Sequence, residues 1–233
     1  MVNMIGDNIA AIRERIRTAE EKSGRSHGEV RLMGVSKFHT LEEMLAASED
    51  VDLLGENRVQ EAIEKRRGWP EDNSTQWHLI GHLQRNKVRK ALEVFSAVES
   101  VDTFDLARAI NVILAESERK GYPVFVEVNT SGEATKSGVA PQEAEQLVSR
   151  ILKYCPAVSV EGLMTIGPNT DDISAIRRAF ESLRELRESL RGSLGIELPE
   201  LSMGMSGDYE AAIEEGSTIV RIGTGIFGPR DYK

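Results

Sequence analysis

Cysteine, aromatic side chains and long apolar runs are all scarce in this chain. Its 233 residues include a single cysteine and only 5% aromatic residues. One cysteine excludes a disulfide scaffold and a metal site built from several cysteines, and it fits a reducing compartment, so we expect a cytoplasmic protein. No apolar run approaches the roughly 18–20 residues of a membrane helix. Residues 1–22 alternate apolar with charged side chains, which is not the pattern of a signal peptide.

Positive charge is also in short supply. The chain has 29 Lys and Arg residues against 38 Asp and Glu residues, which gives a net charge of −9 at pH 7. Non-specific binding to nucleic acid or to an anionic membrane needs a basic surface, so we expect neither partner. The length is ample for a hydrophobic core, and single α/β barrels commonly run to about 200–250 residues. Because no linker or low-complexity tract interrupts the sequence, we expect one domain over residues 1–233.

Short apolar runs, often β-branched, recur along the chain and are each followed by a helix-like segment. Continuous apolar runs are typical of strands that are buried on both faces, as in a parallel sheet. The eight predicted strands are Val30–Ser36, Asp52–Glu56, Gln76–Gly81, Ser96–Val101, Pro123–Asn129, Ser159–Gly167, Pro199–Met205 and Ser217–Gly223.

Apolar residues at steps of three or four predict helices between these strands. One helix is expected over residues 173–190 with Asp171 or Asp172 as its cap, and another over 104–114 with Asp102 or Thr103 as its cap. An additional helix at the N-terminus carries Ile5, Ile9, Ile12 and Ile16 on one face. Eight strand–helix units in one domain predict an α/β fold of the (β/α)8 TIM barrel class with an extra N-terminal helix. The alternative is a doubly wound open sheet.

Two glycine-rich turns follow the last two predicted strands. They are Ser202–Asp208 and Gly223–Gly225, and a helix-like segment follows the first of them. Barrels of this class often bind a phosphate with the loops after strands seven and eight, where glycines let the backbone approach the anion. Ser206 and Thr224 would donate their hydroxyls to such a phosphate. The alternative is that the glycines only make tight turns.

A lysine and an arginine suggest which class of phosphorylated compound would bind at these turns. Lys37 follows the first strand, where the strand end would present it at the barrel mouth, although most lysines are solvated surface charges. A lysine there can form a Schiff base with a phosphorylated carbonyl compound, either a sugar phosphate or pyridoxal phosphate. Arg221 lies in the eighth strand. If it faces inward it needs a partner, and it could donate to a pyridine nitrogen. The alternative is that it faces outward.

Six stretches of the chain carry a resemblance to a known family. In family order they are Gly34–Thr40, Leu54–Glu61, Trp77–Lys87, Val128–Val139, Glu161–Pro168 and Leu201–Arg230. With these motifs the chain resembles the pyridoxal phosphate homeostasis protein family over nearly its whole length. The resemblance implies a single barrel similar to the N-terminal domain of alanine racemases.

The resemblance also implies a set of site residues. It implies pyridoxal 5'-phosphate on Lys37, Asn57 beside the cofactor, the phosphate on the two glycine-rich turns and Arg221 opposite the ring nitrogen. The predicted cofactor-binding residues are Lys37, Asn57, Met205, Ser206, Arg221, Gly223 and Thr224. His82, Lys87, Glu133 and Lys136 also lie in family motifs; Lys136 is a candidate for a secondary contact with the aldehyde, and the other three have no assigned role.

The choice between an enzyme and a carrier depends on a second base. Alanine racemases use the Schiff-base lysine and a tyrosine from an additional C-terminal domain, whereas this sequence ends at Lys233, soon after the predicted barrel. Tyr209 is the only tyrosine expected near the mouth, and no convincing second base is evident. We therefore expect a monomer that binds pyridoxal phosphate in intracellular vitamin B6 homeostasis and amino-acid and keto-acid balance, without robust catalysis. Apo-enzymes that need the cofactor are the expected recipients. The alternatives are a racemase or related small enzyme, and a Schiff-base aldolase.

The remaining titratable side chains are less informative. His78 lies within the third predicted strand and is expected to be a hydrogen-bonded core residue. Cys155 precedes a proline in a loop, where nothing in the sequence indicates activation of its thiol.

Overall fold

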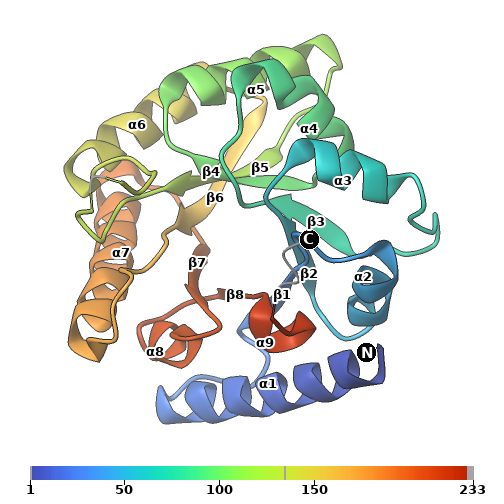
Figure 1. Cartoon of the computed structure of the whole chain (residues 1–233). Coiled ribbons are helices and arrows are strands. Elements are labelled where there is room, and N and C mark those ends of the chain that lie inside the picture. The colour runs from blue at the N-terminus through green and yellow to red at the C-terminus, as the bar shows by residue number, and fades with distance from the viewer. Residues whose placement is uncertain (1, 134, 230–233) are drawn as a thin grey trace.

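Eight parallel strands form a closed barrel in the computed structural model of the chain, which describes residues 2–133 and 135–229 (Figure 1). The strands follow one another around the barrel in sequence order, and β8 pairs with β1 to close it. This closure confirms the (β/α)8 barrel and excludes the open sheet. The strands are β1 (Arg31–Val35), β2 (Leu53–Glu56), β3 (Gln76–Leu79), β4 (Ala97–Val101), β5 (Tyr122–Glu127), β6 (Val158–Met164), β7 (Glu200–Met205) and β8 (Ile219–Ile222).

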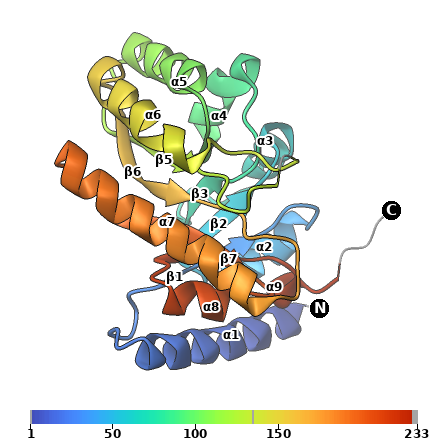
Figure 2. The same cartoon turned by 90° about the vertical axis from the view of Figure 1, so that its left-hand side faces the viewer.

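Helices surround the barrel, and the side view in Figure 2 shows them along its outer wall. Their apolar faces and the outward-facing strand residues make one large core cluster between sheet and helices. The helices are α1 (Val2–Lys22), α2 (Leu41–Ser48), α3 (Val59–Arg66), η1 (a 3₁₀ turn, Arg85–Lys87), α4 (Val88–Val94), α5 (Phe104–Glu116), α6 (Pro141–Tyr154), α7 (Ile173–Leu194), α8 (Tyr209–Glu214) and α9 (Thr224–Phe227).

A second, smaller apolar cluster lies inside the barrel. It is built from inward-facing residues of six strands: Met33, Leu53, Ala97, Phe125, Met164 and Ile219. A barrel of eight strands is just wide enough for side chains to fill it, so the interior is packed and the open space lies at the ends.

The predicted N-terminal helix is confirmed as α1. Its four isoleucines, Ile5, Ile9, Ile12 and Ile16, are all buried, because α1 packs across α8, α9 and α2. In Figures 1 and 2 it runs along the outside of the barrel beside these elements. Since α8 and α9 are short, α1 provides much of the apolar cover on this side of the barrel.

The structure shows which of the two candidate residues caps each predicted helix. Thr103 accepts a hydrogen bond from the backbone N–H of Leu106, and Asp172 accepts one from Ser174. Each side-chain oxygen thereby satisfies a backbone N–H of the first turn that has no carbonyl partner within the helix. Thr40 caps α2 in the same way, and the Glu43 carboxylate returns a contact to the Thr40 backbone N–H. The sequence pattern predicted a helix-like segment after the first strand without bounds or a cap, although Thr-x-x-Glu is a recognisable capping signal.

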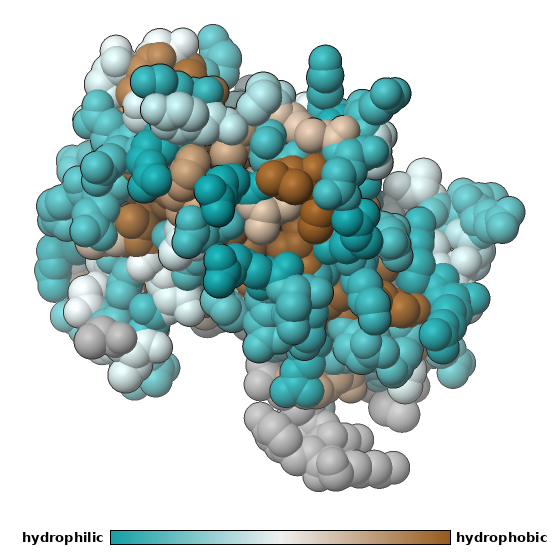
Figure 3. All heavy atoms as spheres, turned by 90° about the horizontal axis from the view of Figure 1, so that it is seen from above, coloured by the Kyte–Doolittle hydropathy of each residue, from teal (hydrophilic) through white to brown (hydrophobic). Residues whose placement is uncertain are grey.

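The outer surface of the helix layer is mainly hydrophilic. Figure 3 looks down on the side that α4, α5 and α6 cover, and apolar side chains gather near the middle of that view. The exposed large apolar residues of α5 and α6 are Val112, Leu152 and Tyr154. Such exposed apolar residues are normal on folded proteins. None of the helices described over 2–133 and 135–229 is long and apolar enough to cross a bilayer.

Candidate functional site

A cavity of about 260 Å³ opens at the carboxyl ends of the strands, and we call it the mouth cavity. It draws its walls from β1, β2, β3, β6, β7 and β8 or the loops that follow them. All seven residues predicted to bind a cofactor are part of its lining, which consists of Val35, Lys37, Asn57, Ile80, Met164, Ile166, Met205, Ser206, Gly207, Arg221, Gly223 and Thr224. The structure therefore brings the predicted residues together, although they are far apart in sequence.

Two turns form one side of the mouth cavity and are tied to each other. The hydroxyl of Ser206, in the turn after β7, accepts a hydrogen bond of 3.3 Å from the backbone N–H of Gly225 in the turn after β8. The hydroxyl that accepts this bond still has its own proton to donate. Gly204, near the end of β7, has φ +95°, and a Cβ there would stand 2.6 Å from the Cβ of Ala212, so the approach to this turn requires glycine.

Asn57 follows β2 on another side of the cavity. Its Oδ1 is buried and has no hydrogen-bond partner within the described part of the chain. A buried polar atom without a partner is costly, and it points to a missing ligand or water. Gly81, after β3, packs directly against the main chain of Asn57, since a Cβ at Gly81 would stand 2.3 Å from the carbonyl oxygen of Asn57.

The Gly81→Ala substitution is expected to lower the free energy of unfolding by about 1–3 kcal/mol, because the added methyl group must displace the Asn57 backbone. Urea denaturation of the two proteins measures this. The matched control is Gly192→Ala in α7, where a Cβ meets nothing within 4 Å. That change should stabilise the chain by roughly 0.5–1 kcal/mol, since alanine is the better helix former. Equal effects at both positions would contradict the tight contact behind Asn57.

Arg221 faces into the barrel and is buried, with 4% of its surface exposed. The outward-facing alternative is therefore wrong. One Nη donates to the Ser202 hydroxyl at 2.7 Å and the other donates to the Thr165 carbonyl at 2.7 Å. The Ser202 hydroxyl in turn donates to Glu99 Oε2 at 2.6 Å. The second oxygen of Glu99 lies 2.6 Å from His78 Nδ1.

The charges inside the barrel compensate one another. Burial raises the pKa of Glu99, but the hydrogen bonds and charges of His78, Arg221 and Ser202 outweigh it, and the net pKa lies below its usual value. Burial lowers the pKa of Arg221, and the carboxylates of Glu99, Asp208 and Glu127 oppose that effect. Glu127 is also buried, and burial is the main reason that its pKa rises to about 7. The Arg221 guanidinium thus stands at the floor of the mouth cavity as a neutralised cation.

Comparison with known proteins agrees with this geometry. The family model described as "Alanine racemase, N-terminal domain" matches residues 8–231. A protein of Vibrio cholerae named "Pyridoxal phosphate homeostasis protein" is 42% identical over 98% of this chain and 97% of its own length. One of the same name from Vibrio alginolyticus is 41% identical over 99% of this chain and 100% of its own length. The chain belongs to the pyridoxal phosphate homeostasis protein family.

A solved structure extends this assignment to three dimensions. PipY of Synechococcus elongatus, solved with PLP bound, is 32% identical and superposes with a TM-score of 0.80. The match covers 93% of this chain and all of PipY. The resemblance seen in the sequence motifs is therefore confirmed for the family and for the fold.

The other residues in the family motifs lie away from the mouth cavity lining. His82 and Lys87 are exposed. Lys136 donates to the Gly167 carbonyl and pairs with Glu133 at 3.1 Å. The structure thus holds Lys136 in a loop contact outside the cavity walls, and its secondary contact with an aldehyde stays a prediction.

Tyr209 is not at the mouth cavity. It is buried against the guanidinium of Arg15, which lies 5.2 Å from the ring centroid, and lines a separate cavity of about 170 Å³. Tyr122 is buried elsewhere and donates to the Phe95 carbonyl, and Tyr154 is exposed on α6. Tyr232, the fourth tyrosine, lies outside the described residues.

Sequence reasoning missed the interior partners of Arg221 and the apolar wall of the mouth cavity. Ile80, Met164 and Ile166 form that wall, and nothing in their immediate sequence separates them from other core residues. Glu99 did carry a signal. A single carboxylate within the apolar run Ser96–Val101 requires a buried partner, by the same reasoning that was applied to Arg221.

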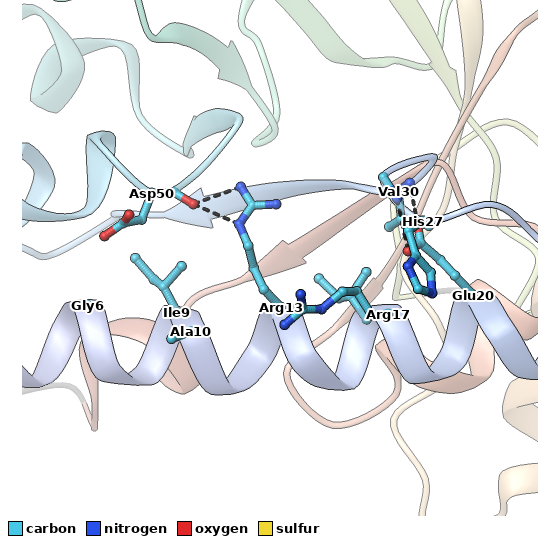
Figure 4. Close-up of a pocket in the computed structure, with 11 residues that line it drawn as sticks. Gly6, Ile9, Ala10, Arg13, Arg17, Glu20, His27, Val30 and Asp50 are labelled. Atoms are coloured by element: carbon cyan, nitrogen blue, oxygen red, sulfur yellow. Dashed lines mark hydrogen bonds between the residues drawn. The ribbon is translucent and has the colours of Figure 1, made fainter.

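A larger cavity, about 500 Å³, lies between α1 and the loops at the opposite end of β1 (Figure 4). Its polar groups are already engaged. Arg13 donates to the Asp50 carbonyl at 2.7 and 3.0 Å, and the buried Glu20 accepts from the backbone N–H groups of Gly28 and Val30. His27 pairs with Glu21. These contacts attach α1 to the barrel, and none of the seven predicted residues lines this cavity.

Proposed function

We propose that this chain binds pyridoxal 5'-phosphate in the mouth cavity and acts in the homeostasis of that cofactor. The observation that carries the proposal is the convergence of Lys37, Arg221 and two serine- and threonine-bearing turns on one cavity. The names of the relatives and the PLP-bound structure of PipY support the same ligand. In this proposal residues 1–233 act as one domain, as a monomer, in the cytoplasm.

The chemistry of the cavity residues fits this cofactor. The hydroxyls of Ser206 and Thr224 and the backbone at Gly223 suit a phosphate, because glycine lets the main chain approach an anion closely. Lys37 supplies the amine with which the aldehyde of the bound cofactor would condense reversibly, which is the chemistry that this group contributes. Asn57, with its unpaired Oδ1, provides a polar contact for the ring substituents.

Arg221 determines the electronic character of the site. Its guanidinium only donates hydrogen bonds and does not release its proton near neutral pH. Ser202 and Thr165 hold it in place through two hydrogen bonds of 2.7 Å. A pyridine nitrogen placed opposite Arg221 would accept a hydrogen bond from it and stay unprotonated, which would make the ring a weaker electron sink. This arrangement favours holding the cofactor over extensive carbanion chemistry.

The lining of the mouth cavity also supports a role without robust catalysis. Within the described residues that form it, Lys37 and Arg221 are the only titratable side chains. Racemisation needs an acid or base on each face of the substrate carbanion, and arginine is a poor base. Storage of the cofactor and its release to apo-enzymes therefore fit this chain better than turnover of amino acids.

Titration with pyridoxal phosphate, followed by borohydride reduction and peptide mapping, tests the proposal. Wild type should develop a new visible absorption band and carry the reduced adduct on Lys37, whereas Lys37→Ala should lose the band. Lys87→Ala is the matched control, since Lys87 is exposed and outside the cavity. An adduct on another lysine, or no band in the wild type, would disprove the site. Turnover of amino-acid enantiomers that is lost in Lys37→Ala would make the protein a racemase instead.

A further inference from the structure

A cluster of charged residues, with Glu56 buried and Lys65 and Glu61 half-buried, contacts the loop that carries Lys37. The ammonium group of Lys65, in α3, donates to Glu56 Oε1 at 2.6 Å, to Glu61 Oε1 at 2.7 Å and to the Ser36 carbonyl at 2.9 Å. The side chain of Lys65 is 10% exposed, that of Glu56 is fully buried and that of Glu61 is 22% exposed. Because Lys65 is half-buried and its three N–H donors are all satisfied, its ammonium group is held in one place.

The cluster contacts the main chain on both sides of Lys37. On the preceding side, the Ser36 carbonyl accepts from Lys65, and the Ser36 hydroxyl donates to Glu56 Oε1 at 2.8 Å. On the following side, the backbone N–H of Phe38 donates to Glu61 Oε1 at 2.8 Å. The two peptide groups next to Lys37 are therefore fixed by the same ammonium–carboxylate assembly.

The backbone at Phe38 needs such support. Phe38 has φ +69°, a left-handed conformation that a bulky non-glycine residue rarely adopts. Strained conformations of this kind persist where the surrounding structure over-determines them, and they concentrate at functional sites. The contact between Glu61 and the Phe38 N–H is one such determinant.

We propose that Lys65, Glu56 and Glu61 form a positioning cluster for Lys37, which fixes the peptide groups on either side of it and so determines where its amine stands in the mouth cavity. None of the three lines that cavity, so they act through the backbone of Lys37. The inference rests on the proposed function only for the identity of the aldehyde. The position of the amine is a property of the chain alone.

The sharpest test compares two substitutions of Glu61. Glu61→Gln keeps an oxygen that can accept from the Phe38 N–H, whereas Glu61→Ala removes it. We expect covalent uptake of pyridoxal phosphate to slow by about tenfold or more in Glu61→Ala and by much less in Glu61→Gln, since an error of about 1 Å in the placement of a reacting group can cost up to 10²-fold in rate. The affinity for pyridoxine 5'-phosphate, which has the phosphate but no aldehyde, should be nearly unchanged in both.

A second variant probes the cation of the cluster. Lys65→Met alone would leave the Glu56 carboxylate buried without its cation, so the variant of choice is the double change Glu56→Gln with Lys65→Met, which removes both charges. It should slow uptake as Glu61→Ala does. Arg31→Met is the matched control: Arg31 pairs with Glu200 at 2.7 Å at the opposite end of the same strand, β1. This control should leave the uptake rate unchanged.

A measurement without the cofactor separates this inference from the proposed function. The rate at which an amine reagent labels Lys37 in the unliganded protein, followed by peptide mass spectrometry relative to the exposed Lys87, reports the placement of the amine directly. A changed ratio in Glu61→Ala and in the double variant supports the cluster even if the protein takes up no pyridoxal phosphate. Folded variants with wild-type labelling and wild-type uptake overturn it.

Discussion

Replacement of Arg221 by methionine should lower the free energy of unfolding by about 3–5 kcal/mol, because it leaves buried carboxylates without their cation. Glu99 is fully buried and would keep only His78 and Ser202 as partners. The Ser202 hydroxyl and the Thr165 carbonyl would each lose a donor. Urea denaturation of the unliganded protein measures the loss, which should be visible in the absence of any cofactor.

The double variant Arg221→Met with Glu99→Gln distinguishes a charge effect from a packing effect. If the cost arises from the unpaired Glu99 carboxylate, the double variant should recover a substantial part of the stability that Arg221→Met loses. A double-mutant cycle then gives a coupling energy of roughly 0.5–3 kcal/mol for the pair. A loss below about 0.5 kcal/mol for Arg221→Met would mean that the buried charge network contributes little, since ordinary surface substitutions have effects of that size.

The buried strands could be predicted from the sequence because continuous short apolar runs are typical of strands that are buried on both faces. All eight predicted strands are present, with ends that differ by up to three residues; β6, for example, ends at Met164 and not at Gly167. The last residues of those runs belong to the polar loops that line the mouth. The helices α2, α3 and α4 are short, seven or eight residues each. In a helix of this length the spacing of apolar residues repeats too few times to be recognised in the sequence.

The site could be predicted only in part, for a physical reason. Glycine turns and a lysine after a strand carry local signals, and they brought Lys37, Ser206 and Thr224 forward. Asn57 entered through the family resemblance, since nothing local marks it. The network behind Arg221 joins β3, β4, β7 and β8 across the barrel interior, and one sequence does not reveal which inward-facing polar residues will meet. The same holds for the contacts of Lys65.

Glu127→Gln should stabilise the unliganded protein at high pH and have little effect at low pH. Burial, with the nearby charge of Asp102, raises the pKa of Glu127 to about 7 from its usual value of 4.5, and Arg221 opposes this. Below pH 4.5 the carboxyl group is protonated in both the folded and the unfolded state. Between pH 4.5 and 7 the unfolded chain releases a proton that the folded chain retains, so rising pH favours unfolding. Above pH 7 the full cost of about 3 kcal/mol applies.

The measurement is urea denaturation of both proteins between pH 4.5 and 8.5. The stability of Glu127→Gln relative to wild type should rise across this range by up to about 3 kcal/mol, and most of the rise should fall between pH 5 and 7. Glu197→Gln is the control for the loss of one negative charge, because the Glu197 side chain is 93% exposed. A pH-independent difference for Glu127→Gln would show that its carboxylate is already solvated or paired in the folded barrel. A rise in the predicted direction would show that the barrel interior holds a carboxyl group that exchanges its proton near neutral pH, within the electrostatic influence of Arg221.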